Sequence, residues 1–254
     1  MPPSEPLLLL PGIIMPAGLR YRPLLEALGD DVHGVPKELF VYSVPEPPPP
    51  GYSIDAEVAD VLRAAEAAGF ERFHLYGHSG GGAVAIAFAA ANGDRLLSLA
   101  LDEPAFDFTD AERVAGAWSQ LDAINALPPP ERIVAFLRMQ LRPGVEPPSR
   151  PEGPSPAWMG ARPAGIDAFT AAARRHSISN DAIRAFDRPV YYSYGSLSSL
   201  EWENRRDRLA ALFPDFTAEL YEGLHHLNTS HQAEPERVAD ALRKVWARAA
   251  TVPG

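Results

Sequence analysis

The chain has 254 residues, a hydrophobic content of 46% and a formal net charge of −10. This acidic balance argues against a nucleic-acid partner and against an anionic membrane surface. Because the sequence contains no cysteine, disulfides, thiolate nucleophiles and Cys-ligated zinc are excluded. The length suits one domain of α/β type. No stretch has the apolar length of a membrane span or the basic start of a signal peptide, so we expect a cytoplasmic protein.

Apolar runs alternate with amphipathic stretches over the first 105 residues. We expect strands at 7–10, 38–44, 73–76 and 96–101, the first of which ends in the Pro11–Gly12 turn. The helices expected between them lie at 21–28, from the N-cap Ser53 to Gly69, and, rich in alanine, after residue 80. Strands that alternate with helices in this way predict a parallel sheet with helices on both faces.

The alternation stops between residues 105 and 188, where we expect helices and no strand. The helical stretches are 110–125, 131–141 and a third within 166–186, with a Pro-rich loop at 143–156. We interpret residues 106–186 as a helical lid and connecting region, inserted into a core of residues 1–105 and 187–254. The large apolar residues of this insertion are candidates for lining a pocket, although packing is the plainer interpretation for each: Phe106, Phe108, Trp118, Phe136, Met139, Trp158 and Met159.

The alternating pattern resumes with a strand at 189–195, a helix at 202–212 and a strand at 217–221. A loop at 222–226 and a final amphipathic helix after Pro235 complete the chain. The core therefore contains about six strands.

The most informative motif is Gly77-His78-Ser79-Gly80-Gly81, which lies between the strand at 73–76 and the Ala-rich helix. It matches the G-x-S-x-G nucleophile elbow, in which a sharp strand-to-helix turn lifts a serine hydroxyl out of the sheet. Glycines flank the serine because side chains there would collide with the adjacent strand and helix. Ser79 is therefore the candidate nucleophile.

The chain resembles the α/β-hydrolase superfamily in the order of its features along the sequence. These features are the glycine turn after the first strand, the elbow, the acidic end of the strand at 96–101, the helical insertion and the late histidines. The resemblance is to short-lidded, esterase-like serine hydrolases. It implies an α/β-hydrolase fold with a mainly parallel sheet, a serine nucleophile, a histidine base and a carboxylate. It also implies an oxyanion hole made by the main-chain N–H groups of Ile13 and Gly80.

Seven histidines are present, and the resemblance places the catalytic one after the last strand. His226 ends the run Gly223-Leu224-His225-His226, which fits the Gly-x-x-His pattern of the superfamily. We therefore favour His226 as the base, with His225 and His231 as alternatives. The remaining histidines are interpreted as structural or surface residues: His33, His74, His78 and His176.

The carboxylate departs from the usual pattern of the superfamily. A Gly-x-x-Asp run is expected after the strand at 189–195, but Ser198 stands in the place of the aspartate. A minority arrangement puts the acid after the strand that follows the elbow helix, and that strand ends here in Asp102-Glu103. Successive strand residues face opposite sides, so only one of the two can reach the histidine. We choose Glu103, with Asp102 and Glu201 as alternatives.

We therefore expect a serine hydrolase that cleaves a carboxylic ester, or a related acyl bond, of a small to medium hydrophobic molecule through an acyl-enzyme. This chemistry needs no metal and no organic cofactor. Thioester, lactone, C–C bond and hydroxynitrile-lyase chemistry stay open, because one fold hosts them all. A noncatalytic ligand-binding protein is the alternative of another class. The sequence does not indicate an oligomeric state.

Overall fold

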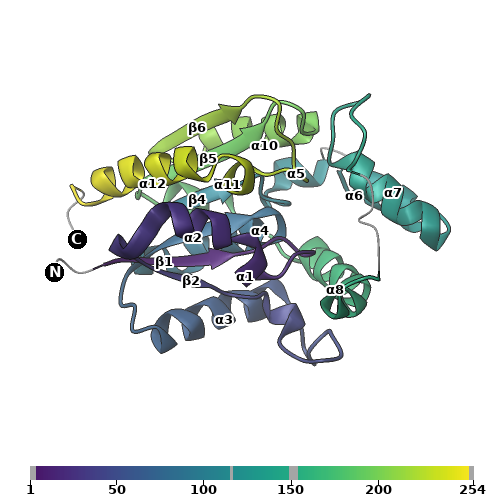
Figure 1. The fold of residues 1–254 in the computed structure, drawn as a ribbon, viewed down its shortest axis with the longest axis horizontal. Helices are drawn as coiled ribbons and strands as arrows, with labels where there is room; N and C mark the ends of the chain where they lie inside the picture. Colours follow the sequence, from purple (N-terminus) through teal and green to yellow (C-terminus); the bar gives the residue numbers. More distant parts are fainter. Residues whose placement is uncertain (1–3, 115–116, 149–153, 252–254) are drawn as a thin grey trace.

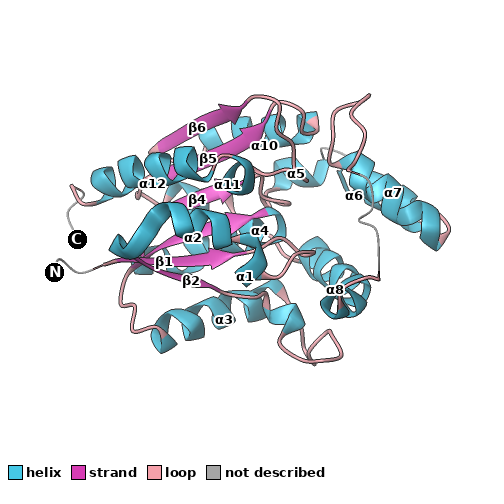
Figure 2. Ribbon diagram, in the orientation of Figure 1, coloured by secondary structure: helices cyan, strands magenta, loops and turns pink. Residues whose placement is uncertain are grey.

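The structure is a computed structural model that describes residues 4–114, 117–148 and 154–251. A sheet forms its centre, with helices packed on both sides (Figures 1 and 2). The amino-terminal end of the first strand and the last helix lie at one end of the molecule, and the helices α6 (Ala117–Asn125) and α7 (Pro129–Met139) lie at the opposite end (Figure 1).

Six strands form one sheet in the order β2-β1-β3-β4-β5-β6, and each neighbouring pair is parallel. This confirms the predicted parallel sheet of about six strands. The strands are β1 (Glu5–Leu10), β2 (Val32–Pro36), β3 (Phe73–His78), β4 (Leu96–Asp102), β5 (Val190–Gly195) and β6 (Phe216–Tyr221).

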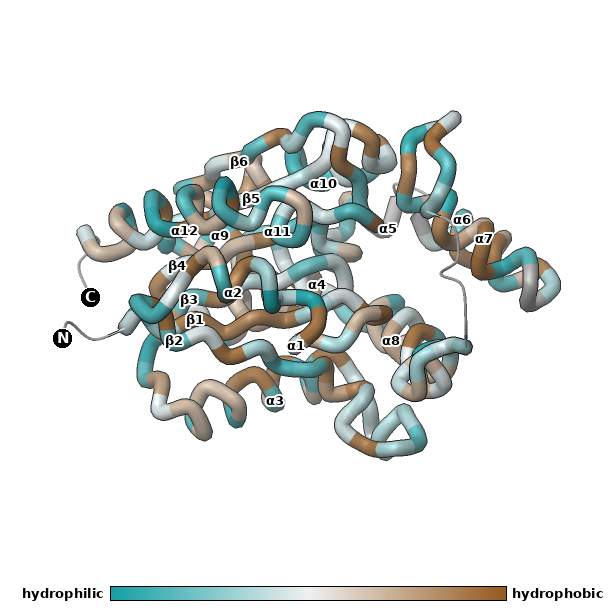
Figure 3. The backbone as a smooth tube through the Cα atoms, in the orientation of Figure 1, coloured by the Kyte–Doolittle hydropathy of each residue, from teal (hydrophilic) through white to brown (hydrophobic). Residues whose placement is uncertain are grey.

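Alternating residues of the strands build two cores. On β1, Leu8 and Leu10 face one cluster, whereas Leu7 and Leu9 face the other. The first cluster packs under α3 (Ile54–Ala67) and α4 (Ser79–Asn92), and the second packs under α2 (Arg22–Leu28) and α12 (Pro235–Ala249). Helix α4 lies so deep that every residue from Ser79 to Ala89 is buried. Brown, hydrophobic segments accordingly run along β1 in Figure 3.

The second strand differs from the prediction. It spans Val32–Pro36, and the predicted strand at 38–44 is replaced by a 3-10 turn at Phe40–Tyr42. The cause is the buried carboxylate of Glu57 on α3, which accepts hydrogen bonds from the main-chain N–H groups of Phe40 and Val41 at 2.7 and 2.9 Å. These N–H groups are thereby withdrawn from any strand ladder.

The described part of the segment between β4 and β5 consists of helices and loops, with one isolated bridge at Leu141 and no strand. The predicted helix at 110–125 is described as two helices, with residues 115–116 outside the described part of the chain. We expected the proline run at 128–130 to precede the next helix, but α7 already starts at Pro129. Proline is favoured in the first turn of a helix, which accounts for the earlier start. The helices of this segment are α5 (Asp110–Val114), α6, α7, α8 (Arg162–Arg175) and α9 (Asn180–Arg184). We call residues 106–186 the helical insertion; its exact boundaries stay a prediction.

The remaining helices are short or border the site: α1 (Ala17–Arg20), α10 (Leu200–Ala210) and α11 (Ser230–Ala233). Helix α10 follows β5, and α11 follows the loop after β6. Both therefore begin at the carboxyl edge of the sheet, where ligands bind in folds of this type.

Gly81 provides a test of how tightly α4 packs against β1. A methyl group on Gly81 would lie 2.3 Å from the carbonyl oxygen of Leu10, a main-chain atom that cannot rotate away. We expect Gly81→Ala to lower the free energy of unfolding in urea by about 3 kcal/mol, the upper end of the cost of overpacking. Gly18→Ala is the matched control, because nothing lies within 4 Å of its added methyl group. Equal unfolding midpoints for the two variants would contradict this packing.

Candidate active site

Ser79 occupies the sharp turn between β3 and α4. Its backbone is left-handed, with φ of 51°, a conformation that residues with side chains rarely adopt. Two main-chain hydrogen bonds hold the turn: Gly81 N–H donates to Pro11 O at 3.0 Å, and Ala105 N–H donates to Ser79 O at 2.8 Å. The turn is thus fixed between the chain that leaves β1 and the chain that leaves β4.

His226 lies in the loop that follows β6. Gly223 turns the chain with φ of 76°, and the main chains of His225 and Asn228 bond to each other across the loop. This conformation directs the His226 side chain inward, where it is 6% exposed. Its Nε2 lies 3.0 Å from Oγ of Ser79.

Glu103 follows β4 directly and also has a left-handed backbone, with φ of 44°. Its two carboxylate oxygens have separate partners: Oε2 lies 2.8 Å from Nδ1 of His226, and Oε1 accepts from Gly195 N–H at 2.9 Å. Because a carboxylate can only accept, Nδ1 carries the imidazole proton and Nε2 is left to accept from the Ser79 hydroxyl. The structure therefore brings Ser79, His226 and Glu103 into one chain of hydrogen bonds.

The two other late histidines lie in different surroundings. Nδ1 of His225 accepts from the N–H groups of Leu227 and Asn228, at 3.2 and 3.1 Å, so this ring caps its own loop. Nδ1 of His231 bonds to Asp102 at 2.7 Å. Of the three candidates for the base, only His226 is hydrogen-bonded to Ser79.

The two alternative carboxylates are also engaged elsewhere. Asp102, the last residue of β4, binds His231, whereas Glu103, just past the strand, binds His226. Glu201, in the first turn of α10, pairs with Arg205 at 3.2 Å and with Arg208 at 2.9 Å. Neither of them is hydrogen-bonded to His226.

The N–H groups of Ile13 and Gly80 lie close to the Ser79 turn. A Cβ built on Gly80 would lie 3.6 Å from Ile13 N, so the two residues face each other. N–H groups in the first turn of a helix have no acceptor within it. Among the main-chain hydrogen bonds of the described residues, neither group has an acceptor. Both remain available to an oxygen atom in the site.

Tyr42 fixes the main chain of Ile13. Its hydroxyl donates to Ile13 O at 2.6 Å, and its ring lies beneath the guanidinium of Arg162, 3.8 Å from ring centroid to Cζ. Burial raises the pKa of Tyr42 to about 12, so the hydroxyl stays a donor at ordinary pH. The 3-10 turn that replaces the predicted strand thus supports the chain next to Ser79.

An open cleft reaches Ser79. Its walls come from the ends of β1 and β4, from the helical insertion and from α10. The apolar lining residues are Ile13, Ala105, Phe106, Leu121, Phe136, Met139, Phe169 and Trp202. Of the insertion residues singled out from the sequence, Phe106, Phe136 and Met139 line this cleft.

Two rings pack against His226. The indole of Trp202 is stacked on the imidazole, with centroids 4.5 Å apart and planes 7° apart, and the His78 ring is tilted against it at 4.9 Å and 31°. His226 is therefore held by two rings as well as by its hydrogen bonds.

A buried ionic cluster supports the Trp202 wall. The Arg205 guanidinium lies over Trp202, 5.0 Å from the ring centroid, and donates to Glu112 at 2.7 Å and to Pro104 O at 3.0 Å. Burial raises the pKa of Glu112 above its ordinary value. Because Glu112 belongs to α5 and Arg205 to α10, the cluster ties the insertion to the core beside the site.

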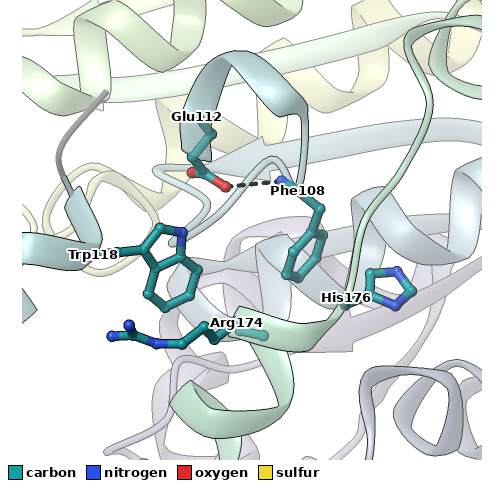
Figure 4. Close-up of a pocket in the computed structure, with 6 residues that line it drawn as sticks. Phe108, Glu112, Trp118, Arg174 and His176 are labelled. Carbon is teal, nitrogen blue, oxygen red and sulfur yellow. Dashed lines mark hydrogen bonds between the residues drawn. The ribbon is translucent and has the colours of Figure 1, made fainter. Parts of the chain in front are cut away.

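A second, tightly packed hollow lies within the insertion (Figure 4). Figure 4 shows Glu112 turned toward the main chain of Phe108, whose N–H donates to it at 2.9 Å, and Arg174 beneath Trp118. Arg174 also pairs with Asp122. Glu112 and Arg174 thus each have a partner outside this hollow, as expected for packing between helices.

Three residues that shape the site carried no usable signal in the sequence. Trp202, Tyr42 and Arg205 lie far from the elbow motif in sequence, and nothing in their spacing indicates that they meet it. From the sequence, Trp202 is recognisable only as an aromatic residue at the start of the helix that follows the strand at 189–195. That position is a weak local signal for a side chain near the carboxyl edge of the sheet.

The chain belongs to the alpha/beta hydrolase fold family, whose model matches residues 5–232. A search of curated protein sequences found no match. The family assignment agrees with the parallel sheet, the Ser79 turn and the position of the His226 loop.

Solved structures with the same fold include hydrolases of several kinds. A thermophilic esterase from Thermogutta terrifontis is 22% identical, with a TM-score of 0.67 over 98% of this chain and 92% of that one. An esterase from Rhodococcus sp. ECU1013 is 20% identical, with a TM-score of 0.69 over 96% and 90%. A meta-cleavage product hydrolase from Pseudomonas fluorescens IP01 is 16% identical, with a TM-score of 0.67 over 97% and 92%. At these identities the likeness shows the fold alone.

Within residues 4–114, 117–148 and 154–251, no helix combines the length and the apolar character needed to cross a membrane. No group of three or more His, Asp or Glu side chains in these ranges is arranged to hold a metal ion.

Proposed function

We propose that the protein is a serine hydrolase that cleaves a carboxylic ester, or a related acyl bond, through an acyl-enzyme. The continuous chain of hydrogen bonds from Ser79 through His226 to Glu103, at 3.0 and 2.8 Å, carries this proposal. A serine hydroxyl alone is a poor nucleophile and needs a positioned base, which in turn needs a group to orient it. In this function the three residues form a catalytic triad.

In the first half of the reaction, Ser79 Oγ attacks the carbonyl carbon of the ester while Nε2 of His226 takes the hydroxyl proton. Glu103 keeps the proton on Nδ1 and stabilises the imidazolium that forms. The C–O bond to the alcohol then breaks, and His226 donates its proton to the leaving oxygen. Ser79 is left acylated.

The negative charge that develops on the carbonyl oxygen needs donors that are already in place. The unpaired N–H groups of Ile13 and Gly80 are suited to this role, because they lie next to the Ser79 turn and the positive end of α4 points toward it. Tyr42 supports this oxyanion hole by holding Ile13 through its carbonyl oxygen.

In the second half, water replaces the alcohol. Nε2 of His226 takes a proton from the water as its oxygen attacks the acyl carbon, and the same proton returns to Ser79 when the acid leaves. Every proton in this scheme moves through one imidazole, so neither a metal nor an organic cofactor is required.

The cleft supports a small to medium hydrophobic substrate. Its apolar walls, including Phe106, Phe136 and Phe169, extend from Ser79 toward solvent, and apolar groups gain free energy by leaving water there. Two similar structures bear the name esterase and two bear the name meta-cleavage product hydrolase, so this fold accommodates both kinds of bond. A small-molecule substrate without nucleic-acid or membrane partners, and a cytoplasmic location, remain predictions from the sequence.

Ser79→Ala tests the nucleophile. We expect the wild-type protein to react covalently with an active-site fluorophosphonate and the variant not to react, because its nucleophilic oxygen is gone. Ester turnover should fall by about a millionfold, as in comparable serine enzymes. Ser199→Ala is the control, since Ser199 lines the same cleft without a base beside it. A folded wild-type protein that takes up no label would favour a noncatalytic ligand-binding protein instead.

Glu103→Gln tests the acid. Glutamine keeps the size of the side chain but favours the wrong tautomer of His226, so we expect kcat to fall by about 10⁴-fold with little change in KM. Glu201→Gln should retain most of its turnover, because Glu201 binds Arg205 and Arg208 rather than the base. If Glu103→Gln is folded and nearly fully active, another carboxylate serves His226.

A series of p-nitrophenyl esters of increasing acyl length tests the substrate class. Burial of each methylene group stabilises a complex by ~0.8 kcal/mol, so kcat/KM should rise by about fourfold per methylene while the chain lies in the cleft. Phe136→Ser should flatten this dependence, whereas Ile133→Ser on the same helix should not, because Ile133 is exposed and lies outside the cleft. Equal effects of both variants would argue against this binding mode.

A further inference from the structure

A buried amide side chain, that of Gln140, lies in the wall of the apolar cleft. Gln140 follows the last residue of α7, lines the cleft and is only 6% exposed. Cleft walls that are mainly apolar commonly contain a few polar groups, which orient the ligand and select it. The hydrogen bonds of Gln140 show which of its polar atoms is free for this purpose.

The main chain of Gln140 is fixed to the start of α10. Its carbonyl oxygen accepts from Ser199 N–H at 3.0 Å and from Nε1 of Trp202 at 3.4 Å. Two residues further on, Arg142 N–H donates to Leu197 O at 3.0 Å. These bonds hold the end of α7 against the chain that follows β5, so Gln140 has a defined position beside Trp202.

The orientation of the amide follows from its one side-chain hydrogen bond. Nε2 of Gln140 donates to Phe136 O at 3.2 Å. A carbonyl oxygen can only accept, so the nitrogen must lie on this side and Oε1 on the other. Among the residues that the structure describes, none donates to Oε1, and this atom is not enclosed by protein. Oε1 is therefore an acceptor open to the cleft that Gln140 lines.

The charged residues of the cleft wall are already paired. Within the described residues these are Glu201 and Arg205, which bond to each other at 3.2 Å. Arg205 also binds Glu112 at 2.7 Å, and Glu201 binds Arg208 at 2.9 Å. The wall thus offers a ligand an unpaired neutral acceptor, and its charges are neutralised by one another. This combination fits an uncharged donor such as a hydroxyl group.

The position of Gln140 indicates which part of an ester carries this donor. In the proposed reaction the leaving oxygen takes its proton from Nε2 of His226, so the alcohol part departs along the His226 side of the cleft. The indole of Trp202 is stacked on the His226 ring, and its Nε1 is bonded to Gln140 O. Gln140 therefore belongs to the wall on the side of the leaving alcohol.

We propose that Gln140 is a specificity-determining residue, whose Oε1 accepts a hydrogen bond from a second hydroxyl group on the alcohol part of the ester. The substrate class is then an uncharged monoester of a diol or polyol. This inference rests on the proposed function and deepens it, because it names the group that the cleft selects.

The selection has a simple physical cause. A ligand that fills the cleft removes water from Oε1 of Gln140. An apolar group placed there leaves the oxygen without a donor, which costs free energy, whereas a hydroxyl group restores the hydrogen bond. Sites built to bond a substrate hydroxyl reject analogues that lack it for the same reason.

The test compares 2-hydroxyethyl butanoate with propyl butanoate, which differ by a hydroxyl in place of a methyl group. Gln140→Met keeps the length of the side chain and removes the acceptor. We expect the ratio of kcat/KM for the hydroxyethyl ester to that for the propyl ester to fall by about tenfold in this variant. A purely structural role of Gln140 would lower both values together and leave the ratio unchanged.

Gln120→Met is the matched control. Gln120 lines the same cleft from α6, but its side chain is exposed and can stay hydrated when a ligand binds. Its substitution should therefore leave the ratio of the two esters as it is in the wild-type protein.

An unchanged ratio in folded Gln140→Met would overturn the inference, as would an equal fall in both variants. If Gln140→Met does not fold, the wild-type protein decides with 2-methoxyethyl butanoate, whose ether oxygen cannot donate. This ester should have a kcat/KM about tenfold below that of the hydroxyethyl ester, and equal values would overturn the inference. A wild-type protein that cleaves no ester and takes up no fluorophosphonate refutes the proposed function itself, whereas cleavage of all three esters without preference refutes only the role of Gln140.

Discussion

One carboxylate joins three segments at the carboxyl edge of the sheet. Glu103 leaves β4 in a left-handed conformation, accepts the N–H of Gly195 at the end of β5, and binds His226 in the loop after β6. Glu103, the turn after β5 and the His226 loop are therefore fixed relative to one another by two hydrogen bonds to one side chain. Since buried carboxylates are stable only when their oxygens are bonded, the position of each segment depends on the other two.

Because Glu103 binds His226, no carboxylate is needed at position 198, where the sequence has a serine. The turn after β5 contributes a main-chain N–H to the site instead of a carboxylate. It also packs directly on the base loop, because a Cβ on Gly195 would lie 2.2 Å from Leu224 O. The carboxylate bound to His226 thus follows β4, and the turn after β5 anchors it through the N–H of Gly195.

The sequence predicted those features that depend on local pattern. The continuous apolar runs of β1, β3 and β4 and the glycines around Ser79 are local signals, and the parallel sheet is as predicted from them. The prediction of a strand at 38–44 was wrong, because Glu57 on the next helix accepts hydrogen bonds from main-chain N–H groups of this segment. Strand propensity takes no account of such a contact between segments. The choice between Asp102 and Glu103 illustrates the same limit. Alternation shows that one of the two faces the base, but only the turn geometry after β4 decides which.

Trp202 connects the cleft to the base. Its indole forms part of the cleft wall, lies flat on the His226 ring, and donates from Nε1 to Gln140 O at 3.4 Å just after α7. Arg205 holds the indole through a cluster that includes Glu112 of the insertion. A substrate that fills the cleft therefore contacts the same ring that orients the imidazole. In the proposed reaction, contacts made there would act on the position of His226 as well as on affinity, and small errors in the position of a catalytic group slow the chemical step. The helical insertion is thus linked to His226 through Trp202, although it supplies no member of the hydrogen-bonded chain.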